Sequence, residues 1–259
     1  MMKLRTLSLA IIIAYTTSAQ KIWDGPLTGG SWATATNWNN NTLPVANDIV
    51  IFPTGISGTI SNINSGNNIT LGGLIVQGNS TITLTNSSSR TITIANGAGA
   101  VDFSINAGAA LTMGTNVNIT LAAGTASNNT IANINGSLLV TNGRTYNTKN
   151  GNVLTTVSGV IQNAGTVTSN AARLLFNNGS MYVHNRAGGN IPLSTWSANS
   201  TCKVTGLTNG DAGNDQQAFG NLVYDCPNMT GNRILGGNGL SIAGNLEIVN
   251  TGAANLVQG

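Results

Sequence analysis

One short pattern recurs from about Ile56 to the end of the chain: three or four β-forming residues that alternate apolar and polar, followed by Gly or Asn. Examples are STITLTN, RTITIANG, AVDFSINAG, VNITLAAG, GLSIAG and NLEIVN. Strict alternation indicates a half-buried strand, and Gly and Asn favour tight turns. Short strands joined only by turns predict the stacked coils of a β-solenoid. We expect an all-β fold, a single-stranded right-handed parallel β-helix, because parallel crossovers are overwhelmingly right-handed.

The alternation also predicts which side chains face the core of each coil. The residues between these positions should face outward, which places Asp102 and the threonines of TITLT on the surface. Disorder is the competing interpretation of a chain rich in Gly, Asn, Ser and Thr, but 41% hydrophobic residues at alternating positions argue against it. The expected inward residues are Ile82, Leu84, Ile92, Ile94, Val101, Phe103, Ile105, Val117, Ile119, Leu121, Leu240, Ile242, Leu246 and Ile248.

Residues 1–19 have the pattern of a secretory signal peptide. Lys3 and Arg5 precede the short apolar run Leu7–Tyr15, and small residues end the segment at Ala19. The run is shorter than the roughly 20 apolar residues that cross a bilayer. We therefore expect cleavage after Ala19 and a secreted or outer-surface protein with no transmembrane segment in the mature chain.

Export changes the interpretation of the charge. The chain has 10 Lys and Arg against 7 Asp and Glu, and removal of Lys3 and Arg5 with the leader leaves eight against seven. The remaining basic residues are scattered singly, whereas nucleic-acid binding needs them clustered on one face. Nucleic acid is therefore not an expected partner.

Residues 20–55 are expected to form an N-terminal capping module ahead of solenoid repeats over 56–259. The module contains Trp23, Trp32 and Trp38. The first coil of a solenoid leaves an apolar end and unpaired strand edges, which large aromatic side chains can cover. The alternative is a platform on which sugars stack.

The module IWDGPLTGGSWATATNWNNNTLPVANDIVIF resembles the start of large exported repeat proteins of Bacteroidetes, which share a W…G.W…NW…P…D.V.I pattern. The segment AFGNLVYDC is similar to the F-x-N-L strand repeats of the same proteins. The resemblance implies a β-helical surface or secreted protein, of the kind often exported by the type IX secretion system. That system uses a C-terminal sorting domain, and none is visible before the chain stops in mid-pattern at Asn255–Gly259. We expect an N-terminal piece of a longer protein.

The chain lacks a recognisable catalytic or metal-binding constellation. Polysaccharide lyases and hydrolases need clustered carboxylates, and only Asp211 and Asp215 lie close together in sequence. Their loop, TNGDAGNDQQ, has oxygen ligands for Ca²⁺ but does not fit the EF-hand spacing, so a polar turn is the favoured interpretation and Ca²⁺ binding stays open. His184, the single histidine, is expected on the outer face beside Tyr182 without a catalytic role. No cofactor or metal is expected.

Cys202 and Cys226 are candidates for a disulfide bond. Their separation in the sequence is close to one expected coil of roughly 20–25 residues, so they could occupy equivalent positions of adjacent coils. Export and an even count favour the bond over two free buried thiols.

The sequence favours a structural or adhesin-like β-helix that displays an Asn- and Thr-rich surface to extracellular glycans or other surface proteins, and it does not favour an enzyme. The alternative is a carbohydrate-binding or carbohydrate-cleaving β-helix. A third, remote interpretation is ice binding, because Thr-x-Thr strands stacked in register form flat hydroxyl arrays. Only TITLT and TITIA show that pattern.

Overall fold

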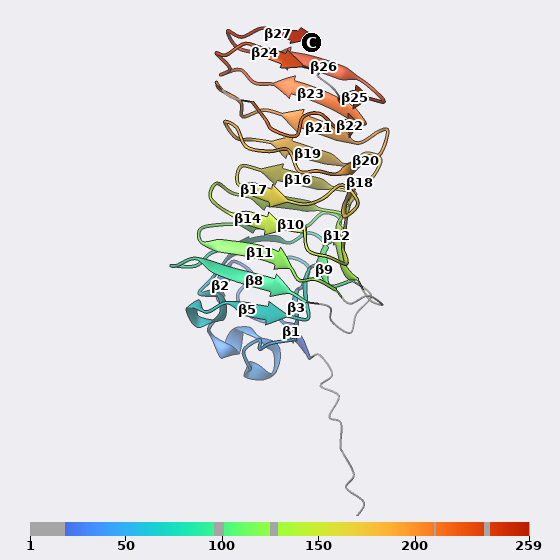
Figure 1. Cartoon of the computed structure of the whole chain (residues 1–259). Coiled ribbons are helices and arrows are strands. Elements are labelled where there is room, and N and C mark those ends of the chain that lie inside the picture. The colour runs from blue at the N-terminus through green and yellow to red at the C-terminus, as the bar shows by residue number, and fades with distance from the viewer. Residues whose placement is uncertain (1–18, 96–100, 125–128, 210, 236–238, 259) are drawn as a thin grey trace, which may run out of the picture.

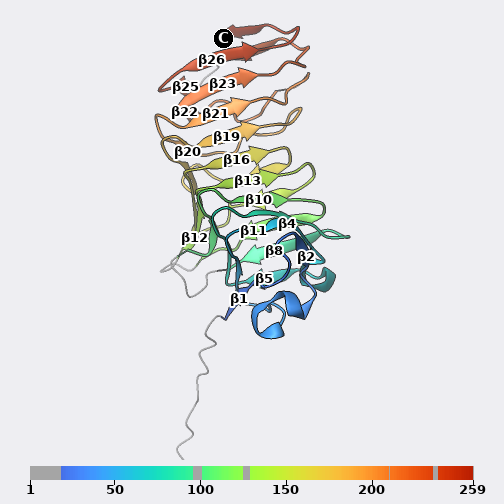
Figure 2. The same cartoon turned by 180° about the vertical axis from the view of Figure 1, so that it is seen from behind.

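The fold is described by a computed structural model over residues 19–95, 101–124, 129–209, 211–235 and 239–258. In these residues the strands run parallel and stack into a β-helix, which confirms the predicted all-β solenoid (Figures 1 and 2). The helical content of the described residues is limited to three short 3₁₀ turns, η1 (Ala35–Asn37), η2 (Asn39–Asn41) and η3 (Ile63–Gly66). The predicted leader lies outside the described residues, except for Ala19.

Three parallel sheets form the faces of the described part of the β-helix. The ten-stranded sheet contains, in spatial order, β2 (Gly29–Ser31), β4 (Ser57–Ser61), β7 (Thr81–Leu84), β10 (Ala110–Met113), β13 (Ser137–Val140), β16 (Val160–Asn163), β19 (Met181–His184), β21 (Thr201–Val204), β23 (Asn221–Asp225) and β26 (Leu246–Asn250). The eight-stranded sheet contains β1 (Gln20–Ile22), β3 (Ile49–Phe52), β6 (Gly73–Val76), β9 (Phe103–Ile105), β12 (Thr130–Ile134), β15 (Val153–Val157), β18 (Leu174–Phe176) and β20 (Thr195–Trp196).

The third face is shorter. Its five-stranded sheet contains β5 (Ile69–Leu71), β8 (Arg90–Ile94), β11 (Val117–Leu121), β14 (Thr145–Asn147) and β17 (Thr166–Thr168). Near the C-terminal end of the described chain two strand pairs follow: β22 (Ala218–Phe219) with β25 (Ser241–Ile242), and β24 (Arg233–Leu235) with β27 (Leu256–Gln258).

The coils differ in length. Leu74 pairs with Phe103 in one coil, whereas Met181 pairs with Thr201 in a later coil that is clearly shorter. The strands keep their register while the loops between them absorb the difference, since loops at the surface tolerate changes of length. A fixed spacing in the sequence is therefore a poor guide to which residues lie above one another.

The core is a continuous column of the alternate residues of each strand. In β11, Val117, Ile119 and Leu121 are fully buried, and the residues between them face outward. The predicted outward position of Asp102 is wrong: the residue is 2% exposed, and its Oδ2 accepts a hydrogen bond from the backbone N–H of Ile131 at 2.9 Å. A buried carboxylate needs such a donor, and the next coil provides it.

Asparagine has two structural roles at the corners. Nine of the ten described non-glycine residues with positive φ are Asn, a backbone region that Asn tolerates better than other side chains. Asn side chains also join successive coils: Oδ1 of Asn68 accepts from the N–H of Thr91, and Oδ1 of Asn118 accepts from the N–H of Thr145, both at 2.9 Å. The abundance of Asn thus follows from the geometry of the coil.

The C-terminal end of the described stack is open. Leu246 and Ile248 pair with the buried Leu222 and Tyr224, as their predicted inward positions require, yet they are 48% and 46% exposed. Their register agrees with the predicted inward positions, and they are exposed because no described strand pairs beyond β26. No helix among the described residues has the length and apolar character needed to cross a bilayer.

Candidate functional site

The three tryptophans of the N-terminal module form one buried cluster. The exposed fractions of Trp23, Trp32 and Trp38 are 2%, 0% and 1%. Trp38 packs edge-on against both other indoles, with ring centroids 5.2 and 4.9 Å apart, and its Nε1 donates to the backbone oxygen of Trp32 at 2.8 Å. Phe52 of β3 contacts all three rings. A sugar needs an exposed ring face, so this burial fits an end cap and leaves no stacking platform.

The two cysteines do not occupy equivalent positions. Cys202 in β21 pairs with Leu222 in β23, whereas Cys226 directly follows the end of β23. Both thiols are free and buried. The predicted one-coil register is wrong, because the coil that begins at β21 is shorter than the sequence separation of the two cysteines.

His184 and Tyr182 lie inside the β-helix, and their predicted outward positions are wrong. Both are fully buried, because the inward set of β19 begins at Tyr182 and not at Met181. Nδ2 of Asn163 donates to the hydroxyl oxygen of Tyr182 at 2.8 Å. The same hydroxyl oxygen lies 3.3 Å from Nδ1 of His184. On the other side of the ring, Nε2 of His184 lies 3.0 Å from the backbone oxygen of Gly188. A neutral imidazole protonated at Nε2 satisfies all three hydrogen bonds.

The electrostatics favour that neutral form. The pKa of His184 is lowered to about 4, mainly by burial and also by the positive charge of the nearby Arg186, against the opposing effect of the hydrogen bond to Gly188. Burial also raises the pKa of Tyr182 well above its ordinary value. Both ring nitrogens of the neutral His184 are engaged in hydrogen bonds, and the Tyr182 hydroxyl stays protonated, so the pair satisfies polar atoms inside the core.

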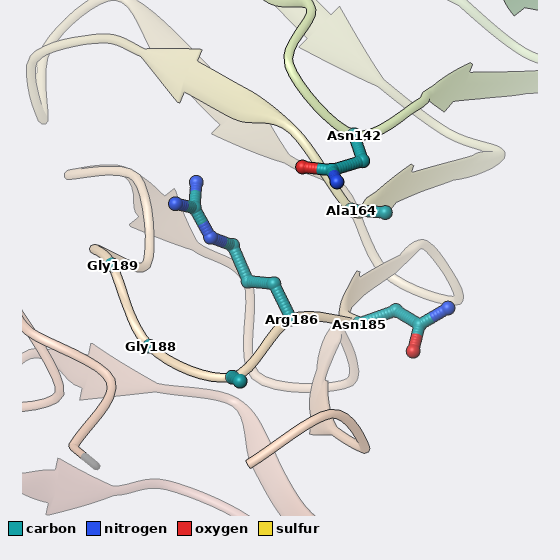
Figure 3. A pocket seen from close by; sticks show the side chains of 7 residues that line it. Asn142, Ala164, Asn185, Arg186, Gly188 and Gly189 are labelled. Atoms are coloured by element: carbon teal, nitrogen blue, oxygen red, sulfur yellow. The ribbon is translucent and has the colours of Figure 1, made fainter. Parts of the chain in front are cut away.

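The turn after β19 lines a pocket of about 490 Å³. Its walls are Asn142, Ala164, Asn185, Arg186, Ala187, Gly188 and Gly189. Figure 3 shows the side chains of Asn185 and Arg186 pointing in opposite directions from adjacent positions. Arg186 Nη1 donates to the backbone oxygen of Gly165 and lies 3.3 Å from Oγ1 of Thr166, so the guanidinium ties its turn to the preceding coil.

The chemistry of this pocket is polar and basic. None of its lining residues is a carboxylate, so it lacks the acid pair that glycosidic hydrolysis requires. Asn142, Asn185 and Arg186 can donate hydrogen bonds to a hydroxyl-rich ligand. The pocket has no signal in the sequence, because Asn142 and Arg186 belong to different coils and only the stacking of the coils brings them together.

Asp211 and Asp215 do lie close together, but the buried Arg233 lies between them. Its guanidinium forms ion pairs with both carboxylates, and the side chains of Arg233, Asp211 and Asp215 are 4%, 78% and 17% exposed. The guanidinium and a Ca²⁺ ion would compete for the same oxygens. Among the described residues no group of three or more His, Cys, Asp or Glu side chains could hold a metal ion.

The outer face of the five-stranded sheet is the most regular polar surface of the described chain. Its inward residues, such as Ile92, Ile119 and Tyr146, are buried, and the outward positions within the paired rows are Thr or Asn. One outward row follows the register from strand to strand: Thr70, Thr93, Thr120, Asn147 and Thr168. TITIA belongs to this face, but TITLT lies in β7 of the ten-stranded sheet, so the two Thr-x-Thr segments do not stack on one another.

Comparison with known proteins gives no relative: no family model, curated protein or solved structure matches the chain.

Proposed function

We propose that the chain is an exported structural β-helix, a stalk or adhesin-like segment of the cell surface that displays an uncharged Thr- and Asn-rich face. The observation that carries this proposal is the continuous parallel pairing of the ten-stranded sheet from β2 to β26 over one core, with a single register shift between Tyr224 and Asp225 in the last pair. Such a stack provides length and surface, because each coil is stabilised only by its neighbours. The scattered carboxylates of the described residues support a non-enzymatic role, since Asp48 and Asp102 bind backbone N–H groups and Asp225 pairs with Lys203.

The test removes one coil from the stack. Deletion of residues 181–200 brings Thr201 to the position of its register partner Met181, and it also removes His184 and Arg186. The chain and the deletion variant, each with a C-terminal epitope tag, are produced in an exporting bacterium. We expect both tagged proteins to leave the cytoplasm with an N-terminus at Gln20, and we expect no turnover of neutral or acidic polysaccharides. A tag that stays in the cytoplasm contradicts export, and polysaccharide cleavage contradicts the structural role.

Carbohydrate binding is the second candidate, and the pocket beside Arg186 favours it. Its volume of about 490 Å³ lies in the range of small-ligand sites, and amide and guanidinium donors line it. A polysaccharide panel distinguishes the two functions. Saturable binding that is lost on Asn142→Ala and Arg186→Ala, but kept by Asn178→Ala on a neighbouring exposed turn, supports the pocket. If the unmodified chain binds no polysaccharide, carbohydrate binding is rejected and only the structural role stays.

A further inference from the structure

The five-stranded sheet has a property that a plain stalk does not need, which is a two-dimensional lattice of hydroxyl and amide groups. Figure 1 shows β5, β8, β11, β14 and β17 stacked on one side of the β-helix. Besides the row that begins at Thr70, a second outward row contains Thr91 and Asn118, which pair directly, and Thr145 and Thr166, which also pair. The hydrogen bond from the Thr145 N–H to Asn118 Oδ1 joins the two halves of this row. Neither row contains a charged or aromatic residue.

The spacing of this lattice follows from β-geometry. Neighbouring strands lie about 4.8 Å apart, and residues i and i+2 of a strand lie about 6.6 Å apart. In ice, each O–H···O contact is about 2.75 Å, so a tetrahedral lattice places second-neighbour oxygens about 4.5 Å apart and repeats every two layers at about 7.3 Å. The spacing between strands of the sheet therefore differs from the second-neighbour distance in ice by a few tenths of an ångström. The spacing along a strand differs from the two-layer repeat of ice by about 0.7 Å.

Three of the four hydroxyl groups in the first row are available to water, and that of Thr168 donates to Oδ1 of the neighbouring Asn147 at 2.8 Å. Thr is β-branched and has few χ1 rotamers, so binding costs little side-chain entropy. Within the described residues, no hydrogen bond inside the chain engages the hydroxyls of Thr70, Thr93 or Thr120. The Thr methyl groups between them restrict the orientation of first-shell water. We propose that this outer face binds ice, by holding a layer of water whose rows match the ice lattice.

Polysaccharide is the competing occupant of a flat hydroxyl face, but the composition of the described surface does not favour it. Sugar rings pack on exposed aromatic faces, and every described Trp and Tyr is buried. A charged glycan would need charge of opposite sign, which the two outward rows lack. Ice binding requires neither exposed aromatic rings nor charged groups, since it depends on the regular spacing of polar groups. This activity is additional to the structural role proposed above.

The test is inhibition of ice recrystallisation by the purified chain. Thr93→Tyr and Thr120→Tyr place a bulky ring in the middle of the lattice and leave the core untouched. Thr83→Tyr is the matched control, because Thr83 has the same Thr-Ile-Thr context and outward position but lies in β7 of the ten-stranded sheet. The outward row that contains Thr83 has only three threonines in succession, because Leu139 pairs with Thr112 in the next strand.

We expect the unmodified chain and Thr83→Tyr to inhibit recrystallisation, and each of the other two variants to need about tenfold more protein for the same effect, a loss of about 1.4 kcal/mol. Far-UV circular dichroism and thermal unfolding verify that all four proteins are folded. Lack of inhibition by the unmodified chain, or an equal loss in all three variants, overturns the proposal. Polysaccharide binding that depends on Thr93 and Thr120 without ice inhibition also overturns it, in favour of a glycan.

Discussion

Phe176 and Trp196 stack face to face, with ring centroids 4.3 Å apart and ring planes within 7° of parallel. They are register partners in β18 and β20, so the stack runs along the axis of the β-helix. Trp196 also contacts Phe219 of the following coil, at 5.2 Å between centroids. These aromatic rings connect successive coils in the C-terminal half of the described stack, which makes Trp196 a central residue of its core.

Trp196→Ala is expected to lower the free energy of unfolding by about 3–5 kcal/mol, because it leaves a cavity between two aromatic rings. Urea denaturation followed by circular dichroism measures the change. Thr195→Ala is the control, since its side chain is exposed and its loss should cost less than about 1 kcal/mol. A Trp196→Ala effect as small as the control would show that the neighbouring coils close the cavity.

The stability of the chain should fall as the pH is lowered from about 6.5 towards 4, because of His184. Its folded-state pKa of about 4 lies below the ordinary value of 6.5, so in this window the unfolded chain binds the proton and the folded chain does not. The contribution is fully present above pH 6.5 and reaches about 3 kcal/mol at most. Melting temperatures of the unmodified chain and His184→Gln, measured at pH 4 to 7, test this. A pH dependence that is equal in both proteins would assign it to other groups.

The fold was predictable because its signal is local. Alternation of apolar and polar residues in a strand such as Val117–Leu121 is a direct consequence of the side-chain period of two, and it assigns the core residues without knowledge of the neighbouring coils. The Asn-rich corners follow from backbone preference in the same way.

The site was less predictable because it depends on register. Coils of unequal length place Leu222, and not Cys226, next to Cys202, and they place the two Thr-x-Thr segments on different faces. Asn118-Ile-Thr120 and Thr145-Tyr-Asn147 carry no distinctive motif, yet stacking makes them parts of one lattice. The prediction for His184 was wrong because the alternation of inward and outward residues in β19 was placed one residue out of phase. A shift of one residue moves a side chain from the surface to the core.

Cys202 and Cys226 are expected to remain free thiols protected from solvent. Burial raises the pKa of both thiols, so the reactive thiolate is scarce at neutral pH. Iodoacetamide should modify neither residue in the native chain and both after denaturation without a reductant, as measured by intact mass. A disulfide-linked peptide in the non-reduced digest would contradict the register between β21 and β23.

Asp215 is expected to matter more for stability than Asp211, although both pair with Arg233. Asp211 is 78% exposed, and an exposed ion pair contributes less than about 1 kcal/mol. Asp215 is 17% exposed and holds the other side of a guanidinium that is almost completely buried, so Asp215→Asn should cost about 1–3 kcal/mol. The double variant leaves the buried cation without a carboxylate, and it should lose more than the sum of the single variants, approaching about 3–5 kcal/mol. Chemical denaturation of the three variants measures these differences. Equal costs for Asp211→Asn and Asp215→Asn would show that solvent reaches the guanidinium, and that the Arg233 pairs contribute only as surface ion pairs do.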